Sequence, residues 1–172
     1  LIKKHDINSH DVTKVEIHTF ENAVNLDSIT PKTIEEAQYS MPFVVGSALL
    51  DKEFGPRQIC ENRLDDPEIK AQAKKINLIV DEAFSKRYPE KIHARVVVYT
   101  KDGQAYSDTN ISVWGDADDP LSDDDLKYKF LTLSKESVTP AQAKELMDMI
   151  WNLSKISSIN ALVSRLHDYC LS

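Results

Sequence analysis

The chain has 172 residues, enough for one domain or for one domain with an appendage. Acidic side chains outnumber Lys and Arg by 28 to 21, so the formal net charge is −7. Because neutralised phosphates supply most of the affinity for nucleic acid, this charge argues against a nucleic-acid partner. The one long uncharged stretch, residues 37–50, is shorter than the ~20 apolar residues of a membrane span, so we expect no membrane partner.

Two isolated cysteines, Cys60 and Cys170, form neither a disulfide framework nor a zinc motif. With no visible signal or transit peptide, they predict a reducing, cytoplasmic location. The opening residues 1–5, Leu-Ile-Lys-Lys-His, are typical of the end of a helix whose beginning is absent. We therefore expect the chain to be a piece of a longer protein.

A half-buried strand is predicted over residues 12–20, because Val15, Ile17 and Thr19 alternate with polar side chains. Residues 21–34 show little periodicity, and we expect a loop there.

A buried helix is predicted next, since the residues from Phe43 to Leu50 are apolar on nearly every side. Ser40 can cap its start, and Pro42 suits its first turn. Gly46 costs about 1 kcal/mol relative to Ala inside a helix. We expect another backbone or a ligand to approach it closely.

The middle of the chain mixes helices and strands. Asp102-Gly103 between two alternating runs predicts a hairpin, since both residues tolerate positive φ. The fold class expected is α+β, a small mixed sheet with a hairpin covered by helices. The expected segments are helices over 54–62 and 64–75, a strand over 77–80, and hairpin strands over 92–100 and 104–113.

A run of acids over 116–125 permits two interpretations. It lacks the central Gly and terminal Glu of an EF-hand calcium loop. A helix that begins at Ser122, with carboxylates in its first turn, is the favoured interpretation.

The tail is predicted to be helical. Thr139 to Gln142 form a capping box with Pro140 at the first helical position. A second helix begins near Ser157 and carries a regular apolar face of Ile159, Leu162, Val163 and Leu166. We divide the chain into an α/β domain, 1–134, and terminal helices, 135–172, which could dock on a body that the chain does not contain.

No complete catalytic set emerges from the pattern alone. The five histidines (His5, His10, His18, His93 and His167) lack metal-ligand spacing, and the sequence has no nucleophile elbow, P-loop or dinucleotide turn. His18 and His93 are expected to face solvent on their strands. Cys60 is expected to be a buried, inert thiol on a helix. We expect no bound metal.

An ordered series of short motifs resembles the second domain of the MmgE/PrpD family. That family includes 2-methylcitrate dehydratase, cis-aconitate decarboxylase and iminodisuccinate epimerase. The resemblance covers nearly the whole chain. The motifs, in order, are Glu36 to Phe43, Ala48 to Leu50, Asp66-Pro67, Arg87 to Pro89, Val96 to Val98, Asp102-Gly103, Gly115, Pro120 to Ser122, and Lys129-Phe130.

The resemblance implies a smaller α/β lid followed by helices that return to a large all-helical domain. It also implies cofactor-independent chemistry on small di- and tricarboxylates, usually in a homodimer assembled through or with that helical domain. The family's His, Asp and Lys groups for proton transfer lie mostly in the helical domain. The catalytic residues are therefore expected upstream of Leu1.

The resemblance places the substrate-facing part of the lid at residues 37–43. Gln38, Tyr39 and Ser40 are candidates for polar contacts, or they serve only to cap and anchor the helix. Phe43 stands where many members have a Tyr and cannot donate a hydrogen bond or pass a proton. A polycarboxylate site needs converging cations or N–H donors, yet residues 34–51 contain no Lys or Arg. Arg57 and Arg63 lie a little beyond.

The function expected by resemblance is the C-terminal part of a dehydratase-type lyase, inactive by itself. It would remove a proton next to a carboxylate and then expel water or CO₂, with general acid–base catalysis contributing roughly 10²–10⁴-fold. An epimerase or decarboxylase member is a near variant. A non-catalytic assembly or binding module is the alternative of a different class.

Overall fold

The structure is a computed structural model that describes residues 1–110 and 113–170. Its contacts divide the chain into two compact units, Leu1–Val113 and Trp114–Ser172. The division expected after residue 134 falls at the end of a helix within the second unit. Each unit is described by itself below.

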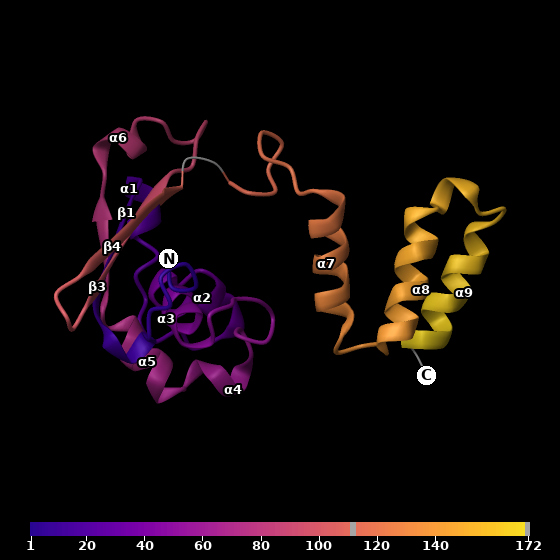
Figure 1. The fold of residues 1–172 in the computed structure, drawn as a ribbon, viewed down its shortest axis with the longest axis horizontal. Helices are drawn as coiled ribbons and strands as arrows, with labels where there is room; N and C mark the ends of the chain where they lie inside the picture. The colour runs from indigo at the N-terminus through magenta and orange to yellow at the C-terminus, as the bar shows by residue number, and fades with distance from the viewer. Residues whose placement is uncertain (111–112, 171–172) are drawn as a thin grey trace. The chain divides into compact units, whose positions relative to one another are not determined.

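A four-stranded mixed sheet organises the first unit, in the order β2-β1-β3-β4; Figure 1 labels β1, β3 and β4. β1 pairs in parallel with β2 and antiparallel with β3, and β3 continues into β4 as an antiparallel hairpin. Together with the helices this confirms the α+β class. The strands are β1, Val12–Thr19; β2, Ile76–Val80; β3, Ala94–Thr100; and β4, Ala105–Asn110.

The predicted alternation of β1 is confirmed. Val15, Ile17 and Thr19 are buried, whereas the residues between them are half-buried. Val15 and Ile17 join the main hydrophobic core with Val98 of β3 and Leu49 of a covering helix. The core therefore lies between one face of the sheet and the helices.

The hairpin turn differs from the expected one. Thr100 O accepts from Gly103 N at 3.0 Å, and only Gly103 has a positive φ, of 81°. A type I turn followed by a left-handed Gly forms the three-residue hairpin loop instead of the two-residue one. Within the expected strand over 104–113, residues 111–112 lie outside the described part of the chain.

Several short helices and the loops between them make up the rest of the first unit. The loop expected over 21–34 contains a one-turn helix, α1, at its start. The helix expected over 54–62 is wrong, because Gly55-Pro56 begins two i→i+3 turns and Cys60 is then extended. The helices are η1, Ser9–Asp11; α1, Glu21–Val24; α2, Ile34–Gln38; α4, Glu61–Leu64; α5, Pro67–Ala73; and α6, Glu82–Ser85.

The central helix α3, Met41–Asp51, forms as predicted. The Ser40 hydroxyl accepts from Phe43 N at 3.0 Å, and Pro42 occupies the first turn. The backbone of α5 approaches Gly46, where an added Cβ would lie 3.1 Å from both Ile69 O and Ala73 N. The close approach expected at this glycine is therefore confirmed, and it lets α3 and α5 pack backbone to backbone.

The second unit consists of helices α7, Asp123–Ser134; α8, Pro140–Trp151; η2, Leu153–Lys155; and α9, Ile159–Cys170. Ser122 and Thr139 cap α7 and α8 with capping boxes, as predicted. α8 packs against both α7 and α9. Glu145 joins α8 to α9, since Arg165 Nε lies 3.0 Å from one carboxylate oxygen and the Tyr169 hydroxyl donates to the other at 2.6 Å.

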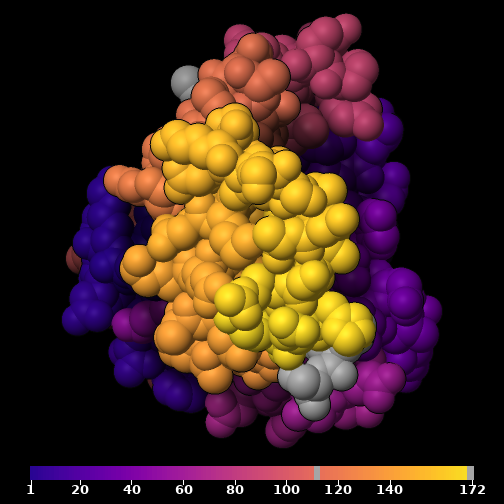
Figure 2. Space-filling view, turned by 90° about the vertical axis from the view of Figure 1, so that its right-hand side faces the viewer, coloured from indigo at the N-terminus to yellow at the C-terminus, as the bar shows by residue number. Residues whose placement is uncertain are grey.

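Few apolar side chains of this helical unit are buried. Among its described residues they are Ala143, Leu146 and Leu162. α8 and α9, orange and yellow in Figure 2, carry several exposed apolar side chains. The exposed large apolar residues of the unit are Trp114, Leu126, Tyr128, Leu133, Ile150, Trp151, Leu153, Ile159, Val163 and Leu166.

Candidate functional site

The candidate segment, residues 38–43, joins the end of α2 to the first turn of α3. Thr33 caps α2 by accepting from Glu36 N at 3.2 Å. Tyr39 ends α2, and Ser40 then starts α3. The Ser40 cap thus lies within this connection, whereas Thr33 caps the start of the preceding helix.

The structure divides the four candidate residues into two pairs. Gln38 and Tyr39 are exposed, with 69% of Tyr39 accessible to solvent. Ser40 and Phe43 are buried, at 0% and 1% exposure. The exposed pair can meet a ligand from outside, whereas the buried pair lies within the first unit.

The buried pair has structural contacts. The Ser40 hydroxyl donates to Ser28 O and accepts from Phe43 N. Phe43 packs in a second core cluster with Ala37, Leu64 and Ile69. The capping role considered for Ser40 is therefore confirmed. The Phe43 ring is enclosed by these apolar neighbours and does not face solvent.

Of the two arginines that closely follow the candidate segment, Arg63 has described contacts, and these stabilise the end of α3. Arg63 Nη2 lies 3.1–3.2 Å from both carboxylate oxygens of Asp51, and its Nε lies 3.4 Å from Asp66. Gln58 donates to the same Asp51 carboxylate at 3.0 Å. Arg63 is thus occupied by two carboxylates and does not supply an open cation to residues 38–43.

The expectation that His93 faces solvent is wrong. Its side chain is 4% exposed and meets the ring of Phe84 edge-on, with ring centroids 5.4 Å apart. It directly precedes β3, where its carbonyl accepts from the Thr19 hydroxyl at 3.1 Å. The expected strand began at residue 92, but β3 begins at Ala94, so the alternation of the strand does not apply to His93 and did not predict its burial. His18 is half-buried and lies 3.6 Å from Glu16.

Cys60 also differs from its prediction. It lies just before α4 and is half-buried, and its thiol donates to Asn62 Oδ1 at 2.8 Å. Among the described residues no group of three or more His, Cys, Asp or Glu side chains is placed to hold a metal ion. No helix within the described ranges is long and apolar enough to cross a membrane.

A charged network on the outer face of the sheet was missed from the sequence. Glu16 accepts from Lys14 and from the Tyr99 hydroxyl, both at 2.9 Å. These hydrogen bonds hold the pKa of the Glu16 carboxyl below its ordinary value. Lys14 and Tyr99 are direct partners on the neighbouring strands β1 and β3. The alternation of β1 indicates that Lys14 and Glu16 share a face of the sheet, but nothing in the sequence indicates that Tyr99 lies beside them. The network joins β1 to β3. None of its residues lies in the candidate segment 38–43.

Together these features define an α+β domain with a capped, partly exposed connection and a helical unit whose apolar surface is largely open. A family model, the MmgE/PrpD C-terminal domain, matches residues 1–155. The chain belongs to the MmgE/PrpD family, of which it contains the C-terminal domain. The match ends at Lys155, the last residue of η2, so α9 lies beyond it. No curated protein matches the chain.

Proposed function

We propose that the chain is the C-terminal part of a cofactor-independent lyase that acts on small di- or tricarboxylates, of the 2-methylcitrate dehydratase type. Family membership supports the general assignment, because the family model covers residues 1–155. In this proposal Gln38 and Tyr39 face the substrate. The acid, the base and the cations that bind its carboxylates belong to a helical domain.

The proposal rests on the chemistry of the candidate segment, which has exposed hydrogen-bonding groups but no cation. It offers one exposed amide and one exposed phenol, but residues 34–51 contain no Lys or Arg. A substrate with two or three carboxylates needs several charge-assisted hydrogen bonds. A second body that carries these groups would complete the site.

The second unit gives independent support for such a body. Ile159, Val163 and Leu166 follow one another along α9 and are 53%, 55% and 39% exposed. Burying apolar area at ~25 cal/mol per Å² would favour docking of this face on another helical surface. We propose that this surface belongs to the helical domain and that the assembled protein is a homodimer, which sedimentation can test.

Turnover assays test the proposal. The chain is assayed alone and after addition of the helical domain of a family member, with docking verified by sedimentation. The substrates are 2-methylcitrate for dehydration, cis-aconitate for decarboxylation and iminodisuccinate for epimerisation. We expect turnover of one of them by the docked pair and none by the chain alone. Activity of the chain alone would contradict the divided site, and an inactive docked pair would contradict the lyase assignment.

A non-catalytic module is the second candidate function. Phe43 favours it, since this buried ring occupies a position where many family members carry a Tyr. A docked pair that binds polycarboxylates without converting them would support the module.

A further inference from the structure

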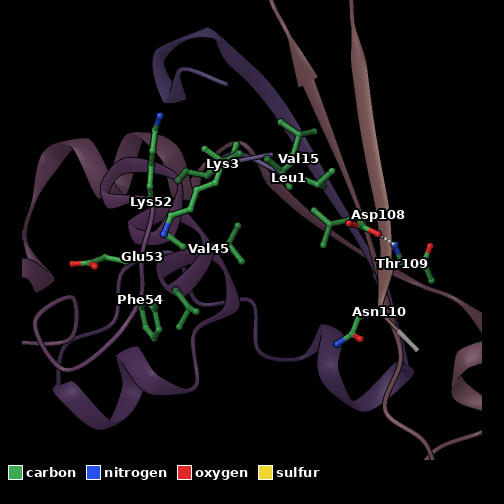
Figure 3. A pocket seen from close by; sticks show the side chains of 17 residues that line it. Leu1, Lys3, Val15, Val45, Lys52, Glu53, Phe54, Asp108, Thr109 and Asn110 are labelled. Atoms are coloured by element: carbon green, nitrogen blue, oxygen red, sulfur yellow. Dashed lines mark hydrogen bonds between the residues drawn. The ribbon is translucent and has the colours of Figure 1, made fainter. Parts of the chain in front are cut away.

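A groove of about 800 Å³ lies between α3 and the sheet in the first unit (Figure 3). Val45 and Ala48 of α3 form one wall, and Val96 of β3 with Asp108 of β4 forms the other. Its floor reaches the main core at Val15, which is 0% exposed. None of the four candidate residues between 38 and 43 lines it. The groove is therefore a separate apolar feature.

The groove marks an open place in the helical layer over the sheet. The helices of this unit make their main sheet contacts with β2, from α1 and α3. Val96 and Val98 face the same side as Ile17 and Val15, their partners in β1. Two neighbouring strands span roughly the ~10 Å width of one helix with its side chains. The place over β3 and β4 thus has the dimensions of one further helix.

Residues 1–6 form a hydrogen-bonded turn beside this groove, with the geometry of a helix ending. His5 N donates to Leu1 O at 3.0 Å, and Ile7 N donates to Ile2 O at 3.0 Å. Asp6 between them has a φ of 48°. A residue with left-handed backbone angles, together with a backbone hydrogen bond that closes a six-residue turn, is the Schellman motif that ends many helices. This geometry confirms the helix end expected from the sequence.

The apolar side chains of that turn are directed to the groove. Leu1 and Ile2 line it and pack against the main core, and Figure 3 shows Leu1 beside Val15. Ile7, which a Schellman ending typically brings against the last turn, belongs to the same core. The turn is therefore fixed in direction and in rotation relative to the groove.

We propose that the groove is the seat of an amphipathic α-helix that runs into the Leu1–His5 turn and completes the helical layer over β3 and β4. Its apolar stripe continues the face of Leu1 and Ile2 and covers Val45 and Val96. Lys3, Lys52 and Glu53 line the α3 side, and Asp108 lines the β4 side. The α3 side therefore carries charges of both signs, whereas a basic residue on the other flank of the helix would complement Asp108.

A helical extension fused in front of Leu1 tests this proposal in the full chain. One version carries leucine three, seven and ten positions before Leu1, which lie on the face shared by Leu1 and Ile2. The matched version carries leucine five, eight and twelve positions before Leu1, on the opposite face. Both fill the other positions with Ala, Glu and Lys, which favour helix. The measurements are the urea midpoint and the methyl NMR shifts of Val45 and Val96.

The in-phase extension is expected to raise the urea midpoint by roughly 0.5–1 M and to move the Val45 and Val96 methyl signals. Ala48→Glu, which places a carboxylate in the groove wall, should abolish that gain, whereas Ala71→Glu, at an exposed position of α5, should leave it. Circular dichroism of both variants without the extension verifies their folding. Equal effects of the two extensions, or a gain that survives Ala48→Glu, would overturn the proposal.

Discussion

Replacing Gly46 by leucine tests whether α3 and α5 meet backbone to backbone. Even the first atom of a side chain, Cβ, would lie 3.1 Å from Ile69 O and from Ala73 N. Both atoms belong to the backbone of α5, so neither can rotate away. The two helices must therefore separate to admit any side chain, and the second core cluster, which includes Phe43 of α3 and Ile69 of α5, opens with them.

Two effects decide the size of the change. Removing a glycine from a helix interior gains about 1 kcal/mol of helix propensity. Inserting extra methylene groups into a packed interior costs ~1–3 kcal/mol, and more when the contact is backbone. Because a whole leucine side chain meets backbone that cannot move aside, we place the cost at the upper end of that range, and after the gain in propensity we expect Gly46→Leu to lower the free energy of unfolding by about 2 kcal/mol. With a urea m-value of about 1–3 kcal/mol/M, the midpoint falls by roughly 1 M.

Urea denaturation followed by circular dichroism measures this shift. Gly55→Ala is the matched control, because an added Cβ there meets only the flexible end of Gln58, at 3.8 Å. We expect its midpoint to stay near that of the unmodified chain. A Gly46→Leu midpoint equal to the control would show that α3 is not buried against α5.

Three further predictions concern the cap, the sheet and the candidate site. Ser40→Ala should cost ~1–2 kcal/mol of unfolding free energy, because it removes the cap of α3 and the bond to Ser28 O; urea denaturation measures the loss. Hydrogen bonds from Lys14 and Tyr99 lower the pKa of Glu16 in the folded chain. The ionised carboxylate therefore contributes its full stabilisation above the ordinary pKa of 4.5. This stabilisation is lost as the pH falls through the lower pKa of the folded state. Glu16→Gln should therefore flatten the acid side of a midpoint-against-pH profile, and an unchanged slope would contradict the assigned cause. In a docked, active pair, Tyr39→Phe should lower kcat/KM while the urea midpoint stays constant, since this phenol is exposed; a midpoint that falls in step with activity would indicate a structural role.

Local chemistry made most of the elements predictable. Ser40, Ser122 and Thr139 each begin a helix where a hydroxyl can accept from a backbone N–H. The alternation of β1 correctly indicated which side chains enter the core. These signals lie within a few residues of the structure they determine, so a single sequence suffices to find them.

Features that depend on contacts distant in sequence were harder to predict. His93 is buried because Phe84 and Thr19 enclose it from other elements. Likewise, the sequence analysis placed Phe43 among the candidate substrate contacts, but in the structure Leu64 and Ile69 pack around its ring. For the candidate site, the sequence singled out the segment 37–43, and only the fold showed that Gln38 and Tyr39 are exposed whereas Ser40 and Phe43 are buried.

The residue pattern permitted open apolar surfaces, as we considered for the terminal helices, but it could not establish that they are open. A regular stripe such as Ile159, Val163 and Leu166 indicates a buried face equally well in a complete helical bundle and in a helix that awaits a partner. Likewise, Val96 and Val98 have the pattern of any half-covered sheet. The structure shows which of these side chains remain exposed or line a groove.

Calorimetric titration of citrate into the chain alone tests most directly whether the polycarboxylate site is completed from outside. We expect no saturable heat, because residues 34–51 supply no cation and Arg63 is held by Asp51 and Asp66. Saturable binding by the chain alone with a Kd below ~1 mM, about 4 kcal/mol of binding free energy, would contradict the divided site.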